Sequence, residues 1–200
     1  MKSTTIPTGS FEANCTILSG DGKAWIVDPG GDARRIAALV RETGCAPAGI
    51  LLTHAHFDHI GAIPELQAIW PGLPVYVHKD DAKVIAHALN QVPPDYPPIP
   101  LPENVRTEGW PDFLEVIETP GHTPGGVCYY LKQDSLLLSG DTLFAGSVGR
   151  TDLPGGHMPT LMASLAKLVE LPGDTRVVPG HGPQTTIGLE KESNPFLAGR

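Results

Sequence analysis

The stretch Thr53-His54-Ala55-His56-Phe57-Asp58-His59 brings three histidines and one aspartate together within six residues. It directly follows Ile50-Leu51-Leu52, an apolar run of the kind that forms a short buried strand. Four titratable side chains at the end of a buried strand would be costly unless a partner took up their lone pairs. A solvated polar turn is the alternative interpretation. The pattern therefore predicts a metal site at the end of this strand.

Three further candidate ligands share one setting, a turn rich in glycine or proline beside an apolar strand. They are His122 in Gly121-His122-Thr123-Pro124, Asp141 in Gly140-Asp141-Thr142, and His181 in Pro179-Gly180-His181. Each alone could equally serve a turn or a cap, but glycine also permits the tight backbone that lets short side chains converge. With the first cluster they make seven ligands, which suit two divalent metal ions sharing one carboxylate. The ligand set does not fix the metal, because imidazole serves several first-row ions and the absence of cysteine removes the softest preference. Zinc is the first expectation, with iron or manganese as alternatives.

The chain around these turns alternates short apolar strands with amphipathic helices. Strands are predicted at 50–53, 75–77, 113–118, 127–131, 136–139 and 176–178, and a hairpin over 14–28 turns at Gly20-Asp21-Gly22. Helices are predicted after Pro29-Gly30-Gly31 as far as Gly44, and at 60–70, 80–89 and 160–171, with the strand at 176–178 as the last regular element. This rhythm is typical of a layered α/β fold, and 200 residues predict one domain, 1–200.

Other polar residues have ordinary roles as their first interpretation. We expect His78, His87 and His157 to be surface or satisfied core residues, although His78 follows a strand and could line a pocket. Asp28, in Val27-Asp28-Pro29, is interpreted equally well as a turn former or as a residue that orients a metal ligand.

The segment 92–102 carries six prolines, which exclude a regular helix there. An extended connector is the first expectation. The alternative is a lid over a substrate pocket, with Tyr96 as a contact.

Composition excludes several classes of function. The formal charge of −8, without any cluster of lysine or arginine, argues against a nucleic acid partner. No apolar run approaches the roughly 18 residues of a membrane span, and the N-terminus lacks the apolar core of a signal peptide. Cys15, Cys45 and Cys128 form no Cys-x-x-Cys pair and are expected to be small, partly buried apolar side chains. We therefore expect a soluble, cytoplasmic protein with a small-molecule substrate and no membrane partner.

The motif His54-x-His56-x-Asp58-His59 resembles the signature of the metallo-β-lactamase superfamily, whose later ligands are similar to His122, Asp141 and His181. The resemblance covers nearly the whole chain. It implies a four-layer αββα sandwich of two mixed sheets with outer helices. It also implies that one ion is held by His54, His56 and His122, the other by Asp58, His59 and His181, and that Asp141 bridges them. Asp58 and Asp141 are thus the carboxylates expected to take part in catalysis, in which two cations lower the pKa of a water for attack on a carbonyl.

Within the superfamily, the stretch 140–144 and the following Gly149-Arg150 resemble glyoxalase II, or hydroxyacylglutathione hydrolase. This implies hydrolysis of S-lactoylglutathione or a related thioester, with Arg150 as a contact for a substrate carboxylate. An ion pair with Asp152 is the equal alternative for Arg150. Long-form glyoxalase II has a C-terminal helical domain for glutathione, whereas 19 residues follow His181 here, with Lys191 and Arg200 expected in a solvated tail.

Other functions stay open at this point. Persulfide dioxygenases share these ligand positions and a stretch like Gly149-Arg150-Thr151-Asp152, but use one iron and oxygen. Hydrolysis of a lactone or β-lactam ring would use the same hydroxide, although a secreted β-lactamase would carry an export signal. A non-catalytic metal-binding module is the remaining alternative. The sequence says nothing of oligomeric state.

Overall fold

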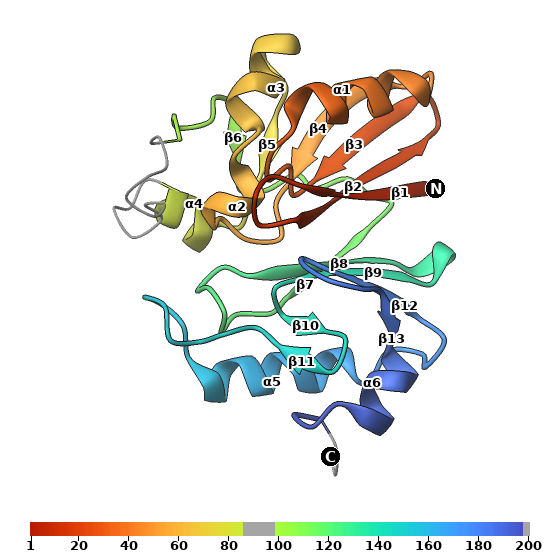
Figure 1. Cartoon of the computed structure of the whole chain (residues 1–200), viewed down its shortest axis with the longest axis vertical. Helices are drawn as coiled ribbons and strands as arrows, with labels where there is room; N and C mark the ends of the chain where they lie inside the picture. Colours follow the sequence, from red (N-terminus) through yellow and green to blue (C-terminus); the bar gives the residue numbers. More distant parts are fainter. Residues whose placement is uncertain (86–98, 198–200) are drawn as a thin grey trace. The chain divides into compact units, whose positions relative to one another are not determined.

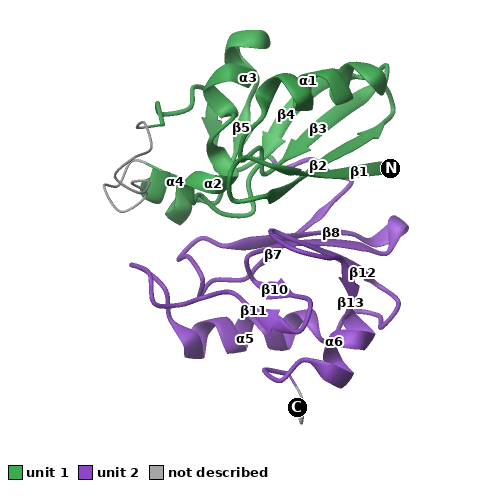
Figure 2. Cartoon of the chain, viewed as in Figure 1, with its two compact units in different colours: residues 1–109 green, residues 110–200 purple. Residues whose placement is uncertain are grey.

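The computed structural model describes residues 1–85 and 99–197. The chain divides into two compact units, Met1–Gly109 and Trp110–Arg200, which Figure 2 distinguishes by colour. The prediction of a single domain stays a prediction, and each unit is described by itself.

The first unit is built on a mixed sheet of six strands in sequence order. Strands β1 (Lys2–Thr8), β2 (Ala13–Gly20) and β3 (Lys23–Val27) pair antiparallel, which confirms the predicted hairpin. From β3 onward β4 (Ala46–Leu51), β5 (Val75–Tyr76) and β6 (Val105–Arg106) run parallel. The sequence prediction did not include β1 or β6.

Four described helices belong to this unit: α1 (Ala33–Glu42), α2 (Phe57–Ile60), α3 (Ile63–Ile69) and α4 (Lys79–Ile85). Helices α1 and α3 lie over one face of the sheet in Figure 1, and buried side chains such as Ile36, Leu66 and Ile26 form the core between them. For the helix predicted at 80–89, α4 confirms the first part, and residues 86–89 lie outside the described residues.

The helix predicted around 60–70 is confirmed by α3, which begins at Ile63, and the short helix α2 before it is separate. The backbone amide of Ala62 donates to the Pro29 carbonyl oxygen at 2.9 Å, so it is not available to the helical ladder. A Cβ at Gly61 would overlap the Gly30 carbonyl oxygen. The chain therefore bends where glycine lets two loops approach closely.

The second unit has a mixed five-stranded sheet in the order β13-β12-β9-β8-β7. Strands β7 (Glu115–Glu118), β8 (Val127–Leu131), β9 (Leu136–Gly140) and β12 (Arg176–Pro179) confirm the strands predicted for this half of the chain. A separate hairpin of β10 (Leu143–Phe144) and β11 (Ser147–Val148) was not predicted.

Helix α5 (Met158–Leu168) confirms the predicted helix near 160–171. The expectation that regular structure ends at 178 was wrong, because β13 (Thr185–Thr186) and α6 (Ile187–Ser193) follow. The Thr186 hydroxyl oxygen accepts from the Leu189 amide at 3.2 Å as an N-cap, and Ile187 is fully buried. Lys191, expected in a solvated tail, donates from this helix to the Val169 carbonyl oxygen at 3.0 Å, and Arg200 lies outside the described residues. None of the described helices is both long and apolar enough to cross a membrane.

Candidate metal centre

In the first unit, the candidate ligands follow the carboxyl ends of parallel strands. Asp28 comes directly after β3, and the His54 loop comes after β4. The Asp28 amide donates to the Leu51 carbonyl oxygen at 3.1 Å, which continues the β3–β4 pairing by one step. Parallel neighbours end at the same edge of a sheet, so Asp28 meets the motif there despite a sequence separation of 25 positions from Thr53.

Asp28 contacts two parts of the motif. Its carboxylate accepts from the Thr53 amide at 2.8 Å and from the Thr53 hydroxyl at 2.6 Å, and lies 3.2 Å from His59 Nδ1. It is 2% exposed and has a left-handed backbone, with φ of 50°. Asp28 therefore does both things that the sequence left open, since it forms the turn and contacts a candidate ligand.

The hydrogen-bond chain assigns a tautomer to His54. The single hydroxyl proton of Thr53 goes to Asp28, so its 3.1 Å contact with His54 Nδ1 requires that nitrogen to donate. The Nε2 atom of His54 then carries the lone pair. This is the usual arrangement behind a metal-binding imidazole.

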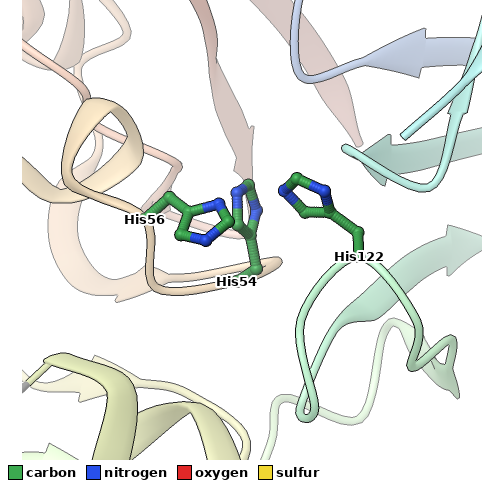
Figure 3. A group of neighbouring side chains, drawn as sticks. All are labelled: His54, His56 and His122. Carbon is green, nitrogen blue, oxygen red and sulfur yellow. The ribbon is translucent and has the colours of Figure 1, made fainter. Parts of the chain in front are cut away.

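The imidazoles of the first unit are crowded. The ring centroid of His54 lies 4.9 Å from that of His56 and 4.1 Å from that of His59, and Figure 3 draws the first two on the loop after β4. Candidate ligand atoms of Asp28, His54 and His59 all lie within 4.8 Å of one another. Asp58, on α2, places Oδ2 3.9 Å from His59 Nε2.

Sequence reasoning missed Asp81, a fully buried carboxylate in the first turn of α4. Its Oδ2 accepts from the Ala55 amide at 2.9 Å, between His54 and His56. The signal was present, because Asp80-Asp81 follows the strand β5 as the motif follows β4. His78 instead contacts Asp80, whose amide lies 3.3 Å from His78 Nδ1.

In the second unit, strand direction explains the position of each candidate ligand. Strands β7 and β9 are both antiparallel to β8, and β12 is parallel to β9, so β7, β9 and β12 all run the same way. Each is followed by one candidate ligand at the same sheet edge: His122, Asp141 and His181. Asp141 Oδ2 lies 3.6 Å from His122 Nε2 and 3.8 Å from His181 Nε2. The structure thus brings these three together.

The orientation of His122 is also determined by the backbone. Its Nδ1 lies 2.8 Å from the Arg150 carbonyl oxygen, which can only accept, so Nδ1 carries the proton and Nε2 points toward Asp141. Gly149 packs so closely that a Cβ there would overlap the Asp141 carbonyl oxygen. Figure 3 draws His122 on the loop that joins β7 to β8.

The Arg150 side chain makes the ion pair that the sequence left as an alternative. Its guanidinium donates to both carboxylate oxygens of Asp152, at 2.7 and 2.6 Å. This hydrogen bonding lowers the pKa of Asp152 to about 2 and raises that of Arg150. His157 Nδ1 lies 2.7 Å from the Thr160 hydroxyl, an ordinary role at the start of α5. The predicted contact Tyr96 and His87 lie outside the described residues.

The donor chemistry of both units fits divalent metal ions. Imidazole nitrogens and carboxylate oxygens suit zinc, iron or manganese. The Nε2-to-carboxylate separations of 3.6–3.9 Å are too long for hydrogen bonds. They approach the roughly 3.3 Å expected between two ligand atoms on one tetrahedral zinc. Ion binding by these residues nevertheless stays a prediction.

A cavity of about 230 Å³ lies beside Asp58 in the first unit. Phe11 and Phe57, whose ring centroids are 5.0 Å apart in an edge-to-face arrangement, contribute to its wall together with Ile99. Backbone of Gly9, Gly30, Gly31 and Gly61 forms much of the remaining wall. The cavity therefore offers an apolar surface next to a candidate ligand.

Comparison with known proteins places this geometry in a family. The family model described as "Metallo-beta-lactamase superfamily" matches residues 8–181. The Bacillus subtilis protein described as "Probable metallo-hydrolase YqgX" is 43% identical, with 100% of this chain and 99% of that protein covered. "Hydroxyacylglutathione hydrolase GloC" of Haemophilus influenzae is 35% identical, with 96% of each covered.

Solved structures agree in fold. TTHA1623 in a di-iron-bound form has a TM-score of 0.86 and 40% identity, with 97% of this chain and 100% of that one covered. The BLEG-1 B3 metallo-β-lactamase has a TM-score of 0.86 and 38% identity, with 99% and 100% covered. The architecture is thus the metallo-β-lactamase fold, α/β layered with mixed sheets and helices, as the sequence predicted.

Proposed function

Because the chain belongs to the metallo-β-lactamase superfamily, whose members include metallo-hydrolases, we propose that it is a metal-dependent thioester hydrolase of the glyoxalase II type. The observation that carries the proposal is the pair of ligand sets at the sheet edges, with tautomers of His54 and His122 that leave Nε2 for a metal. S-lactoylglutathione, or a related thioester, is the proposed substrate.

The relative named hydroxyacylglutathione hydrolase supports this substrate class. This chain covers 96% of that relative's length, so a long additional domain is not part of the protein that bears the name. We therefore propose that the activity does not depend on the C-terminal glutathione domain of the long form.

The chain's own residues have distinct tasks in this proposal. Following the family resemblance, His54, His56 and His122 would hold one ion, Asp58, His59 and His181 would hold the other, and Asp141 would be shared between them. Asp28 and the Arg150 carbonyl hold His59 and His122 in orientation from behind. Asp81 holds the backbone of the motif between its first two histidines.

When bound, two divalent ions lower the pKa of water so that hydroxide exists near neutral pH, and stabilise negative charge on a carbonyl oxygen. Attack on the thioester carbon followed by cleavage of the C–S bond consumes one water and yields a carboxylic acid and a thiol. No protein nucleophile is required. The apolar cavity beside Asp58 is the proposed location of an uncharged part of the substrate.

The decisive experiment is hydrolysis of S-lactoylglutathione by purified protein whose metal content is assayed on the same sample. We expect turnover with about two metals per chain. Asp141→Asn should abolish turnover and remain folded, whereas Asp134→Asn, at an exposed turn of the same unit, should match the wild type. Undiminished turnover by Asp141→Asn would contradict the bridged-metal proposal.

A persulfide dioxygenase is the second candidate, because such enzymes resemble this chain in the ligand positions and in the stretch Gly149-Arg150-Thr151-Asp152. One iron per chain and oxygen uptake on glutathione persulfide, without thioester turnover, would support it instead. A fully loaded protein inactive on both would direct the search to lactones and other thioesters, and then to a non-catalytic role.

A further inference from the structure

A buried carboxylate in the second unit lies outside the proposed ligand set. Glu190, on α6, is 1% exposed. It accepts three hydrogen bonds: from the Thr185 hydroxyl at 2.6 Å, the Asn194 side-chain amide at 2.7 Å and the Gly146 backbone amide at 2.8 Å. An ionisable side chain this deeply buried is costly to place, and all three donors are arranged around it.

Two hydrogen bonds join the turn of the β10–β11 hairpin to Glu190 and Asn194. Gly146 donates its backbone amide to Glu190, and the adjacent Ser147 carbonyl oxygen accepts from the Asn194 amide at 3.1 Å. Asn194 is fully buried as well. Glu190 on α6 and Asn194 just after it thus bond to a backbone amide and a backbone carbonyl of one exposed turn, 44 to 47 positions away in the sequence.

The β10–β11 hairpin connects the candidate ligand Asp141 to Arg150, whose carbonyl oxygen orients the candidate ligand His122. It begins two residues after Asp141 and ends at Val148, just before Gly149 and Arg150. The Gly149 amide returns to the Thr142 carbonyl oxygen at 3.3 Å, which closes the base of the hairpin. The Arg150 carbonyl oxygen then accepts from His122 Nδ1. Displacing the hairpin turn would therefore displace the oxygen that orients His122.

We propose that Glu190 and Asn194 are positioning residues for the metal centre, acting through the β10–β11 hairpin on the Arg150 carbonyl and so on His122. The inference rests on metal binding by His122, as in the proposed function, but not on the identity of the substrate. Partners behind a metal-binding histidine commonly change metal affinity when they are removed.

The test is the rate at which zinc-loaded, full-length protein releases zinc to a chromophoric chelator, which needs no substrate. Glu190→Gln removes the buried charge with little change of shape. Glu192→Gln makes the same substitution on the exposed side of the same helix. We expect about tenfold faster zinc release from Glu190→Gln than from wild type, the low end of the effect of partners behind a ligand, and no change from Glu192→Gln.

Two further variants separate positioning from stability. Thr185→Val removes the hydrogen bond that Glu190 accepts from β13 and keeps its bond to Gly146, so we expect a lower melting temperature with wild-type zinc release. Asn194→Asp removes the donor to the Ser147 carbonyl oxygen, and it tests the same link between α6 and the hairpin turn if Glu190→Gln does not fold. The proposal is overturned if the folded Glu190→Gln and Asn194→Asp proteins release zinc at the wild-type rate. It is also overturned if the zinc-release rates of all these variants simply follow their melting temperatures. Failure of zinc to bind wild-type protein would instead contradict the proposed function.

Discussion

Replacing Asp28 with asparagine should weaken metal binding while the chain remains folded. The carboxylate accepts from two groups of Thr53 and lies beside His59 Nδ1, and asparagine keeps only one of the two oxygens. At least one neighbouring donor then faces an NH2 group. The left-handed backbone is no obstacle, because asparagine tolerates it as aspartate does.

The expected size follows from these contacts. A buried donor left without an acceptor costs about 1–3 kcal/mol of folding free energy. Loss of the carboxylate behind a metal-binding histidine reduces metal affinity roughly 10–100-fold, or about 1.4–2.7 kcal/mol. The first effect should appear as a lower melting temperature of the metal-free protein, and the second as weaker binding well below that temperature.

Competition with a chelator of known zinc affinity measures the second effect, and circular dichroism measures the first. Asp21→Asn is a matched control, because Asp21 has φ of 49° against 50° for Asp28 but is exposed in the β2–β3 turn. Wild-type zinc affinity in a folded Asp28→Asn protein would refute the role assigned to this carboxylate.

Two other predictions concern ionisation and thiol reactivity. Because Arg150 lowers the pKa of Asp152 to about 2, the stabilising effect of the pair is present above the ordinary value of 3.8 and is lost as pH falls through about 2. Arg150→Gln should return this pKa toward 3.8 in an NMR titration, and an unchanged value would contradict the pairing. Cys45 is partly exposed, whereas Cys15 and Cys128 are fully buried, and burial also raises the pKa of Cys15. One thiol per native chain should therefore react rapidly with a disulfide reagent, and rapid reaction of three would show that the packing is wrong.

Elements with strong local patterns were predicted well, and the misses have physical causes. Strand β8 was predicted with its observed bounds, 127–131, because the sequence shows an apolar run bounded by turns, and the structure buries all five residues of that run. Strands β6, β10, β11 and β13 have two residues each, too few to show a period. The break between α2 and α3 depends on the Pro29 carbonyl oxygen, which is remote in sequence and cannot be read from the helix itself.

The candidate site also has features that the sequence predicts and features that only the structure shows. The identity and order of His54, His56, Asp58, His59, His122, Asp141 and His181 could be read directly, because ligand chemistry belongs to each side chain and glycine turns mark their loops. The dual role of Asp28 could be stated only as two alternatives until its partners were known.

The sequence by itself determined the family, the layered α/β class and the candidate ligands, since these depend on side-chain chemistry and on patterns within a few residues. Only the tertiary structure decided what stands behind the ligands. Asp81 reaches Ala55 across 26 positions, the Arg150 carbonyl reaches His122 across 28, and Glu190 reaches Gly146 across 44. Such contacts follow from strand order, strand direction and loop closure, which bring distant parts of the chain to one edge of a sheet.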